Sequence, residues 1–214
     1  PGGARKGSPG VIFAGIMRYD TASGQVRYTE RVYLLSEDQQ LRADSLDILE
    51  GGARLEARGG IRHIISRNRV PDAAGSPSSP GPGPPAKEEG HSPGMPIYIE
   101  SSNLAFANMT NTVTYAGGVS LETGDIRLTC RTLDVVLDAG GGAVDAATAT
   151  GNVVAVMGGK KCTGDVGHYF REPERFVVTG SLAELYDPAS GRSYAPRLTY
   201  TVADGRMQLE QHQN

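Results

Sequence analysis

Residues 26–49 read VRYTERVYLLSEDQQLRADSLDIL, and the same pattern returns without a gap at residues 113–136 as VTYAGGVSLETGDIRLTCRTLDVV. Eight of the 24 aligned positions hold identical residues, and five of these are aliphatic. The identical pairs are Val26 and Val113, Tyr28 and Tyr115, Val32 and Val119, Leu34 and Leu121, Asp38 and Asp125, Leu41 and Leu128, Leu46 and Leu133, and Asp47 and Asp134. An ungapped match that includes tyrosine and a Leu-Asp pair indicates an internal repeat.

Within each copy, apolar and polar residues alternate with a period of two, which is typical of β-strands with one buried face. The alternation is clear at 119–122, 126–130 and 133–137, and it recurs at 198–202. Turn residues rich in glycine separate these runs every 8–12 residues, and no window longer than two turns has a helical period. Short strands at this spacing predict an all-β sandwich, barrel or solenoid.

A proline-rich segment interrupts the repeat. Residues 71–96 hold 8 of the 13 prolines and no Val, Ile, Leu or aromatic residue, so they cannot bury enough apolar surface to order themselves. Subtracting these 26 residues from the offset of 87 leaves a period of 61. A weaker third copy begins near Tyr169, 63 residues after Phe106, and continues through 176–180.

The predicted organisation therefore has four parts. Residues 1–10 form a flexible tail, 11–70 the first repeat, 71–96 a disordered insert, and 97–210 the second and partial third repeats. We expect one continuous stack of strands with the insert looped out, because the first repeat alone would expose an unpaired sheet edge.

The overall composition excludes several classes of protein. Lys and Arg number 21 against 24 Asp and Glu, so the chain lacks the basic excess of a nucleic-acid binder. The 29 glycines and the absence of tryptophan favour many turns and few long helices. No stretch reaches the ~18 consecutive apolar residues that a membrane-spanning helix needs.

Two motifs carry a resemblance to a known family. Each of the first two copies ends in a return strand with glycine before Ile or Val, at 57–61 and 149–153, and residues 41–48 read L-x-A-D-x-L-x-I. In this order the motifs resemble the OstA-like (organic solvent tolerance) domain of the lipopolysaccharide export system, with its LptA-like periplasmic bridge and LptC- and LptD-type relatives. The resemblance covers roughly residues 13–66 and 97–210. It departs from the pattern at Gly60, where Asn is usual, and in the third copy, which lacks both motifs.

The resemblance implies a repeated-strand β-jellyroll, a sheet folded over into two, with an open apolar groove. It implies that the groove holds the acyl chains of lipopolysaccharide and passes the lipid from the inner to the outer membrane along a head-to-tail bridge. Partners would be lipopolysaccharide and other OstA-like export components joined through edge strands, with a homo-oligomer as one option. The location would be the periplasm, and a tether to the inner membrane outside this chain is left open.

The inward positions of the alternation are the candidates for the groove, although each would equally suit a packed core. They are Val32, Leu34, Leu46, Ile48, Val119, Leu121, Ile126, Leu128, Leu133, Val135, Leu137, Val153 and Ala155. Two other functions remain as alternatives: a structural β-solenoid or filament subunit with a filled core, and a carrier of another amphipathic lipid.

No catalytic, metal or cofactor site is predicted. The four histidines are scattered without metal-ligand spacing, and we expect exposed or incidental positions for them. Glycine clusters at 140–142 and 158–159 lack the spacing of a phosphate-binding loop, so we interpret them as turns. Cys130 and Cys162 are either buried free thiols or a disulfide, which an oxidising periplasm would permit.

Overall fold

The computed structural model describes residues 10–36, 38–67, 94–138 and 143–210, and nearly all of them lie in β-strands. These strands form a 13-stranded antiparallel sheet in the described residues, with one short 3-10 helix, η1, at Glu50–Gly52. The all-β prediction is confirmed. The strands are β1 (Val11–Phe13), β2 (Ile16–Asp20), β3 (Gln25–Leu35), β4 (Gln39–Leu49), β5 (Arg54–Arg67), β6 (Gly94–Ala107), β7 (Thr112–Thr123), β8 (Ile126–Leu137), β9 (Val144–Met157), β10 (Lys160–Phe170), β11 (Arg175–Asp187), β12 (Gly191–Thr201) and β13 (Arg206–Glu210).

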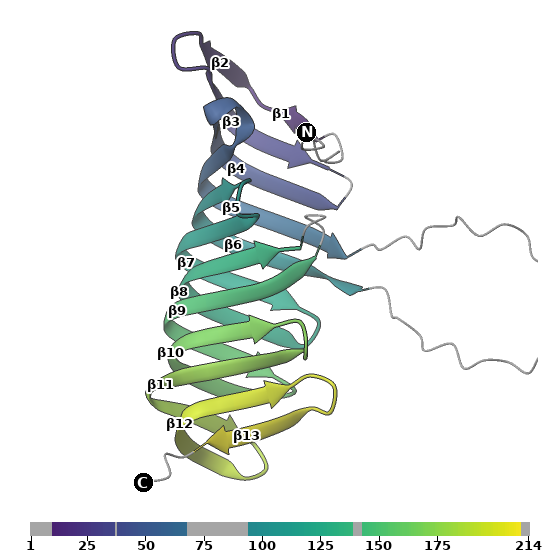
Figure 1. Cartoon of the computed structure of the whole chain (residues 1–214), viewed down its shortest axis with the longest axis vertical. Coiled ribbons are helices and arrows are strands. Elements are labelled where there is room, and N and C mark those ends of the chain that lie inside the picture. The colour runs from purple at the N-terminus through teal and green to yellow at the C-terminus, as the bar shows by residue number, and fades with distance from the viewer. Residues whose placement is uncertain (1–9, 37, 68–93, 139–142, 211–214) are drawn as a thin grey trace, which may run out of the picture.

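The sheet is a meander in which each strand from β3 to β13 pairs with the next strand along the chain. Two short strands share the N-terminal edge: β1 pairs with the second half of β3, and β2 pairs with its first half. β13 forms the opposite edge. Figure 1 shows the resulting long stack, with β1 and β2 at one end and β13 at the other. The sheet therefore does not close into a barrel.

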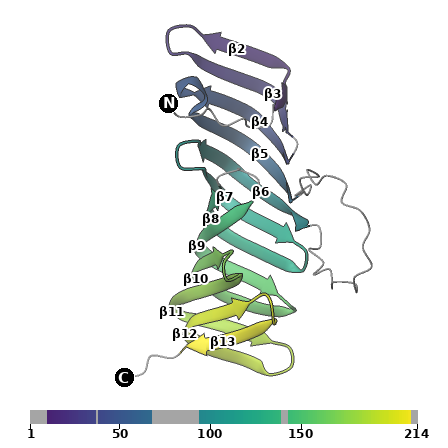
Figure 2. The same cartoon turned by 45° about the vertical axis from the view of Figure 1, so that its right-hand side comes forward.

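A crease runs across the sheet because every strand pair from β3·β4 to β11·β12 has a register shift near its middle. Such β-bulges bend the strands that carry them. In β3 the bulge contains Glu30 and Arg31, whose φ angles are 66° and 59°, and in β7 it contains Gly117 and Gly118. The aligned bulges fold the sheet over, and Figure 2 shows the strands lying in two layers.

We call the two layers wall A and wall B. Wall A consists of β2, β13 and residues 25–29, 45–49, 54–58, 103–107, 112–116, 132–137, 144–150, 166–170, 175–179 and 197–201. Wall B consists of β1 and residues 32–35, 39–43, 61–67, 94–101, 119–123, 126–130, 153–157, 160–163, 183–187 and 191–195.

The sequence repeat corresponds to a structural unit of four strands. An offset of 87 moves the first residues of β3 and β4 onto the first residues of β7 and β8, and it moves the bulge of β3 onto the bulge of β7. The glycines at 117–118 suit the left-handed backbone there, whereas the first copy places two side chains in the same conformation. The repeat is thus a unit of backbone geometry as well as of sequence.

The first and second copies belong to the same sheet, because β5 pairs with β6 along most of its length. β6 begins at Gly94, so the last three residues of the predicted insert, 94–96, are strand and that boundary was wrong. The proline at 96 lies at a register shift between β5 and β6, where a residue without a backbone N–H is tolerated. The rest of the insert, 71–93, and residues 1–9 of the predicted tail lie outside the described residues.

Apolar side chains from both walls fill the space between them. The buried cluster runs from Val32 near one end of the sheet to Tyr200 near the other. Its bulkiest fully buried members include Tyr115, Ile61, Leu133 and Met157. One alternate face of every strand half turns toward this cluster, which explains the period of two in the sequence.

Candidate functional site

The thirteen residues predicted to line a groove lie on the inward-facing positions of the strands. Twelve of them belong to the interior cluster or pack against it, and Ile48 is half-buried between Val26 and Leu55 on the adjacent strands. Nine are no more than 5% exposed, namely Val32, Leu46, Val119, Leu128, Leu133, Val135, Leu137, Val153 and Ala155. Leu34, Leu121 and Ile126 are partly buried. The structure thus brings the candidates together in a filled interior.

The part of this interior next to the insert was not among the predicted groove residues. Ile61 and Ile65 on β5 and Ile97 and Ile99 on β6 are buried and extend the same apolar row across wall B. The alternation is visible on β6, where residues 97–100 read Ile-Tyr-Ile-Glu, whereas on β5 it is obscured because Ile64 stands next to Ile65. The insert separates them in the sequence, which hid that they are neighbours.

One polar pair spans the interior from wall to wall. His63 on wall B and Tyr115 on wall A are hydrogen-bonded, with 2.6 Å between Nδ1 and the hydroxyl oxygen, and their ring centroids lie 5.9 Å apart. His63 is 5% exposed, so the expectation of an exposed or incidental position was wrong for this residue. Because β6 lies between β5 and β7, the contact closes only when the sheet folds over.

Burial governs the ionisation of this pair. It lowers the pKa of His63 to about 4 and raises the pKa of Tyr115, so both groups are neutral near pH 7. Two neutral groups that satisfy each other can be buried at modest cost, whereas either one alone would be an unsatisfied polar group. The pair therefore connects the two walls by a buried hydrogen bond.

The two ends of the interior differ in how well they are covered. At the N-terminal end, Met17 and Tyr19 on β2 are 61% and 58% exposed, although they pair with Tyr28 and Val26 on the inward side of wall A. At the other end, Leu209 on the edge strand β13, which pairs with the inward-facing Leu198, is 39% exposed, and Tyr200 on β12 is only 8% exposed. Its hydroxyl reaches from wall A to the β9–β10 turn of wall B, where a Cβ added at Gly158 would lie 3.2 Å away. The interior is thus more open at its N-terminal end.

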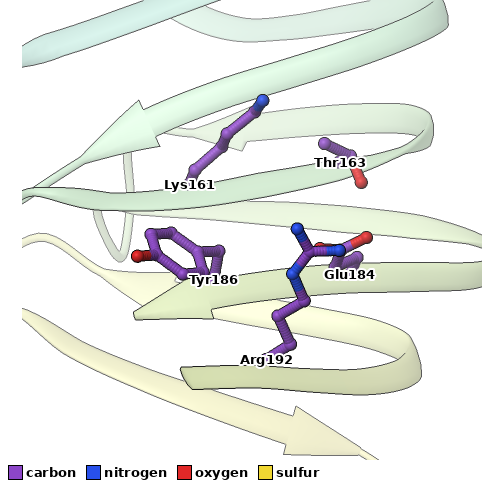
Figure 3. Close-up of a pocket in the computed structure, with 5 residues that line it drawn as sticks. All are labelled: Lys161, Thr163, Glu184, Tyr186 and Arg192. Atoms are coloured by element: carbon purple, nitrogen blue, oxygen red, sulfur yellow. The ribbon is translucent and has the colours of Figure 1, made fainter. Parts of the chain in front are cut away.

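A separate hollow of about 480 Å³ lies on the outer face of wall B, over β10, β11 and β12. Figure 3 shows its lining residues, which are Lys161, Thr163, Glu184, Tyr186 and Arg192. Arg192 and Glu184 form an ion pair of 3.4 Å. Each of the five lining side chains carries a charged or hydroxyl group, and the hollow lies on the opposite side of the sheet from the interior, so it does not suit an acyl chain.

Both cysteines are free and buried in the interior cluster. β9 separates the strands that carry them, and two strand spacings amount to about 10 Å, beyond the reach of a disulfide. Of the two alternatives, the structure has the free thiols. Burial raises the pKa of Cys130 and of Cys162 to about 11, which leaves both thiols protonated and unreactive near pH 7.

Among the described residues, no three His, Cys, Asp or Glu side chains cluster in a way that could hold a metal ion. In the same part of the chain, no helix is long and apolar enough to cross a membrane.

Comparison with known proteins identifies the family. Residues 98–213, which are 116 of the 214 residues, match the family described as LptA/(LptD N-terminal domain) LPS transport protein. The chain belongs to this LptA/LptD N-terminal domain family. The resemblance to the OstA-like domain of lipopolysaccharide export is thereby confirmed. Since this is a family of transport proteins, it agrees with the prediction that the chain is not an enzyme.

Among solved structures, the chain is similar to LptH, the LptA homologous periplasmic component of the lipopolysaccharide transport device from Pseudomonas aeruginosa. The two are 10% identical, the match covers 96% of each chain, and the TM-score is 0.39. No curated protein matches the chain. The family match spans the second and third copies of the repeat, from β6 to beyond β13, and the first copy lies outside it.

Proposed function

We propose that this LptA/LptD-family protein carries lipopolysaccharide through the periplasm by holding its acyl chains between the two walls. The observation that carries the proposal is the apolar interior, which runs from β3 to β12 inside a sheet that is folded over but not closed. A closed barrel can admit a lipid only through an open end. Two walls joined along one crease need only separate.

Burial of an acyl chain supplies free energy for separating the walls. Burying a methylene contributes about 0.8 kcal/mol, so an acyl chain of about twelve carbons gains roughly 10 kcal/mol. That gain offsets the loss of the contacts that the aliphatic side chains of the two walls make with each other. Since apolar burial is not directional, the lipid can move along the interior without losing specific contacts. The hydrogen bond between His63 and Tyr115 is the polar contact that must break where the walls part.

We further propose that lipid enters at the N-terminal end, where Met17 and Tyr19 already expose inward-facing surface. Both ends of the sheet present edge strands, β1 and β2 at one end and β13 at the other, which can pair with the edges of related domains. The partners would be other components of the export system, or a second copy of this chain. A tether to the inner membrane stays a prediction.

Photocrosslinking tests the lipid site directly. A photoreactive residue would be placed at Leu121, Leu128 or Val135, which face the interior, and in matched variants at Glu122, Arg127 or Val136, which face outward on the same strands. We expect purified lipopolysaccharide to crosslink at the first set and not at the second. Leu121 is the most informative position, because it is only partly buried and tolerates a larger side chain.

The outcomes separate the proposal from its alternatives. Equal crosslinking at inward and outward positions of a folded protein would overturn the proposal. Absence of crosslinking at all three inward positions of a folded protein would also overturn it, and would favour a structural β-solenoid with a filled core. If unlabelled phospholipid reduces crosslinking at the inward positions as strongly as unlabelled lipopolysaccharide does, the result would favour a carrier of another amphipathic lipid.

A further inference from the structure

Four exposed apolar side chains form a compact group on the outer face of wall B at the N-terminal end. Val11 pairs with Leu35 and Phe13 pairs with Tyr33, so the four occupy a two-by-two array on β1 and β3. Their exposed fractions are 53%, 39%, 55% and 38% in that order. They point away from the interior, because the alternate residues of these strands face it. We call these four residues the outer patch.

Positive charge adjoins the outer patch. Arg42 pairs with Tyr33 from the next strand, and its guanidinium carbon lies 5.6 Å from the centre of the tyrosine ring. Arg62 continues the same row on β5. Its ion pair with Glu100 is 3.1 Å long, but both side chains are more than 60% exposed, so solvent screens it strongly.

The repeat supplies an internal comparison, because strand pairing defines the same four positions in every copy. In the second copy they hold Tyr98, Glu122, Glu100 and Ser120, and in the third they hold Lys161, Tyr186, Thr163 and Glu184. Figure 3 shows the residues of the third copy on the outer face of the sheet. Charged and polar side chains are therefore compatible with this backbone. The fold does not require four apolar residues there, and a contiguous exposed apolar group indicates a contact surface.

We propose that the outer patch docks the N-terminal end of this protein on an anionic lipid bilayer. Tyrosine is favoured at membrane interfaces, and the aliphatic and phenylalanine side chains gain by leaving water. Arginines beside them are attracted to anionic headgroups, each with about a fivefold gain in binding. The patch lies on the outer face of the first strands of a long stack (Figure 1), and because neighbouring strands of a sheet are rotated by about 20° relative to one another, a flat surface can meet β1 and β3 without following the outer face of the later strands.

This surface is distinct from the edge that would join related domains. The free hydrogen-bonding groups of β1 point along the plane of the sheet, whereas the side chains of the outer patch stand perpendicular to it. Docking on a bilayer also does not require lipid in the interior, so the inference stands independently of the proposed transport site.

Vesicle flotation tests the inference with the full chain. The vesicles contain equal parts of phosphatidylglycerol and phosphatidylcholine, or phosphatidylcholine alone. The patch variant combines Phe13→Glu, Tyr33→Ser and Leu35→Glu, which introduces residues that the second copy holds at these positions. The control variant combines Tyr186→Ser and Tyr194→Ser, which removes two exposed tyrosines from the outer face of the third copy.

We expect the wild type and the control variant to float with the anionic vesicles, and the patch variant to bind them at least tenfold more weakly. Arg42→Thr should weaken binding about fivefold, and 0.5 M NaCl should weaken binding of the wild type. Protection of the buried Cys162 from a thiol reagent in the patch variant would show that its interior is intact.

Three results would overturn the inference. The first is a wild type that does not bind anionic vesicles, and the second is a patch variant that binds them as well as the wild type. The third is self-association of the wild type in sedimentation, abolished in the patch variant without any binding to vesicles, which would make the patch a protein–protein surface.

Discussion

The buried hydrogen-bonded pair of His63 and Tyr115 makes the free energy of unfolding of this protein depend on pH over a defined range. Burial lowers the pKa of His63 from 6.5 to about 4 in the folded state, whereas the unfolded chain retains the ordinary value. At about 1.4 kcal/mol for each tenfold change in proton affinity, the difference amounts to about 3 kcal/mol.

Whether stability rises or falls with pH depends on which state, folded or unfolded, binds the proton. Above pH 6.5 the histidine is neutral in both states, so its ionisation does not change the free energy of unfolding. As the pH falls from 6.5 to 4, His63 binds a proton in the unfolded state but not in the folded state, so the free energy of unfolding declines by about 3 kcal/mol. Below pH 4 the contribution of His63 is constant.

Urea unfolding measured at half-unit steps between pH 7.5 and 4 checks this expectation. His63→Gln, which cannot take up the proton, should flatten the decline. Tyr115→Phe is the matched control: it removes the hydrogen bond and lowers stability by about 1–2 kcal/mol at pH 7, yet it leaves His63 buried and should preserve the decline. If His63→Gln loses stability toward pH 4 as steeply as the wild type, the assignment to His63 is refuted.

Three further expectations concern the interior and the crease. Leu133→Ala, at a fully buried position, should cost 2–5 kcal/mol in urea unfolding, whereas Val136→Ala on the outer face should cost less than about 0.5 kcal/mol; equal losses would contradict a filled interior. Glu30→Gly should raise the free energy of unfolding by about 1 kcal/mol, because Glu30 has a positive φ where the second copy has Gly117. A loss of stability in this variant would show that the contacts of the Glu30 side chain outweigh the strain of its backbone. Cys162 should resist a thiol reagent at pH 7.5 in the native protein and react fully in urea, and rapid labelling of the native state would contradict its burial.

Sequence periodicity predicted a large part of this fold because strand and turn formation are local. Alternation with a period of two identified which residues of β7 and β8 face inward, and the offset of 87 predicted that β3 and β4 repeat them. The glycines at 117–118 suited a backbone that side chains rarely adopt, but Glu30 and Arg31 carried no such signal in the first copy. Prolines predicted an insert up to residue 96, yet β6 begins at Gly94 and pairs with β5, because strand pairing is a contact between segments that local composition does not show.

The sequence alone therefore determined the strands, their inward faces and the repeat, all of which depend on neighbouring residues. Only the tertiary structure decided that aligned bulges fold the sheet into two walls and that side chains fill the space between them. His63 and Tyr115 are 52 residues apart and meet only across that fold. Alternation shows which face of a strand avoids water, but it does not show what lies opposite that face, because that depends on contacts between distant strands.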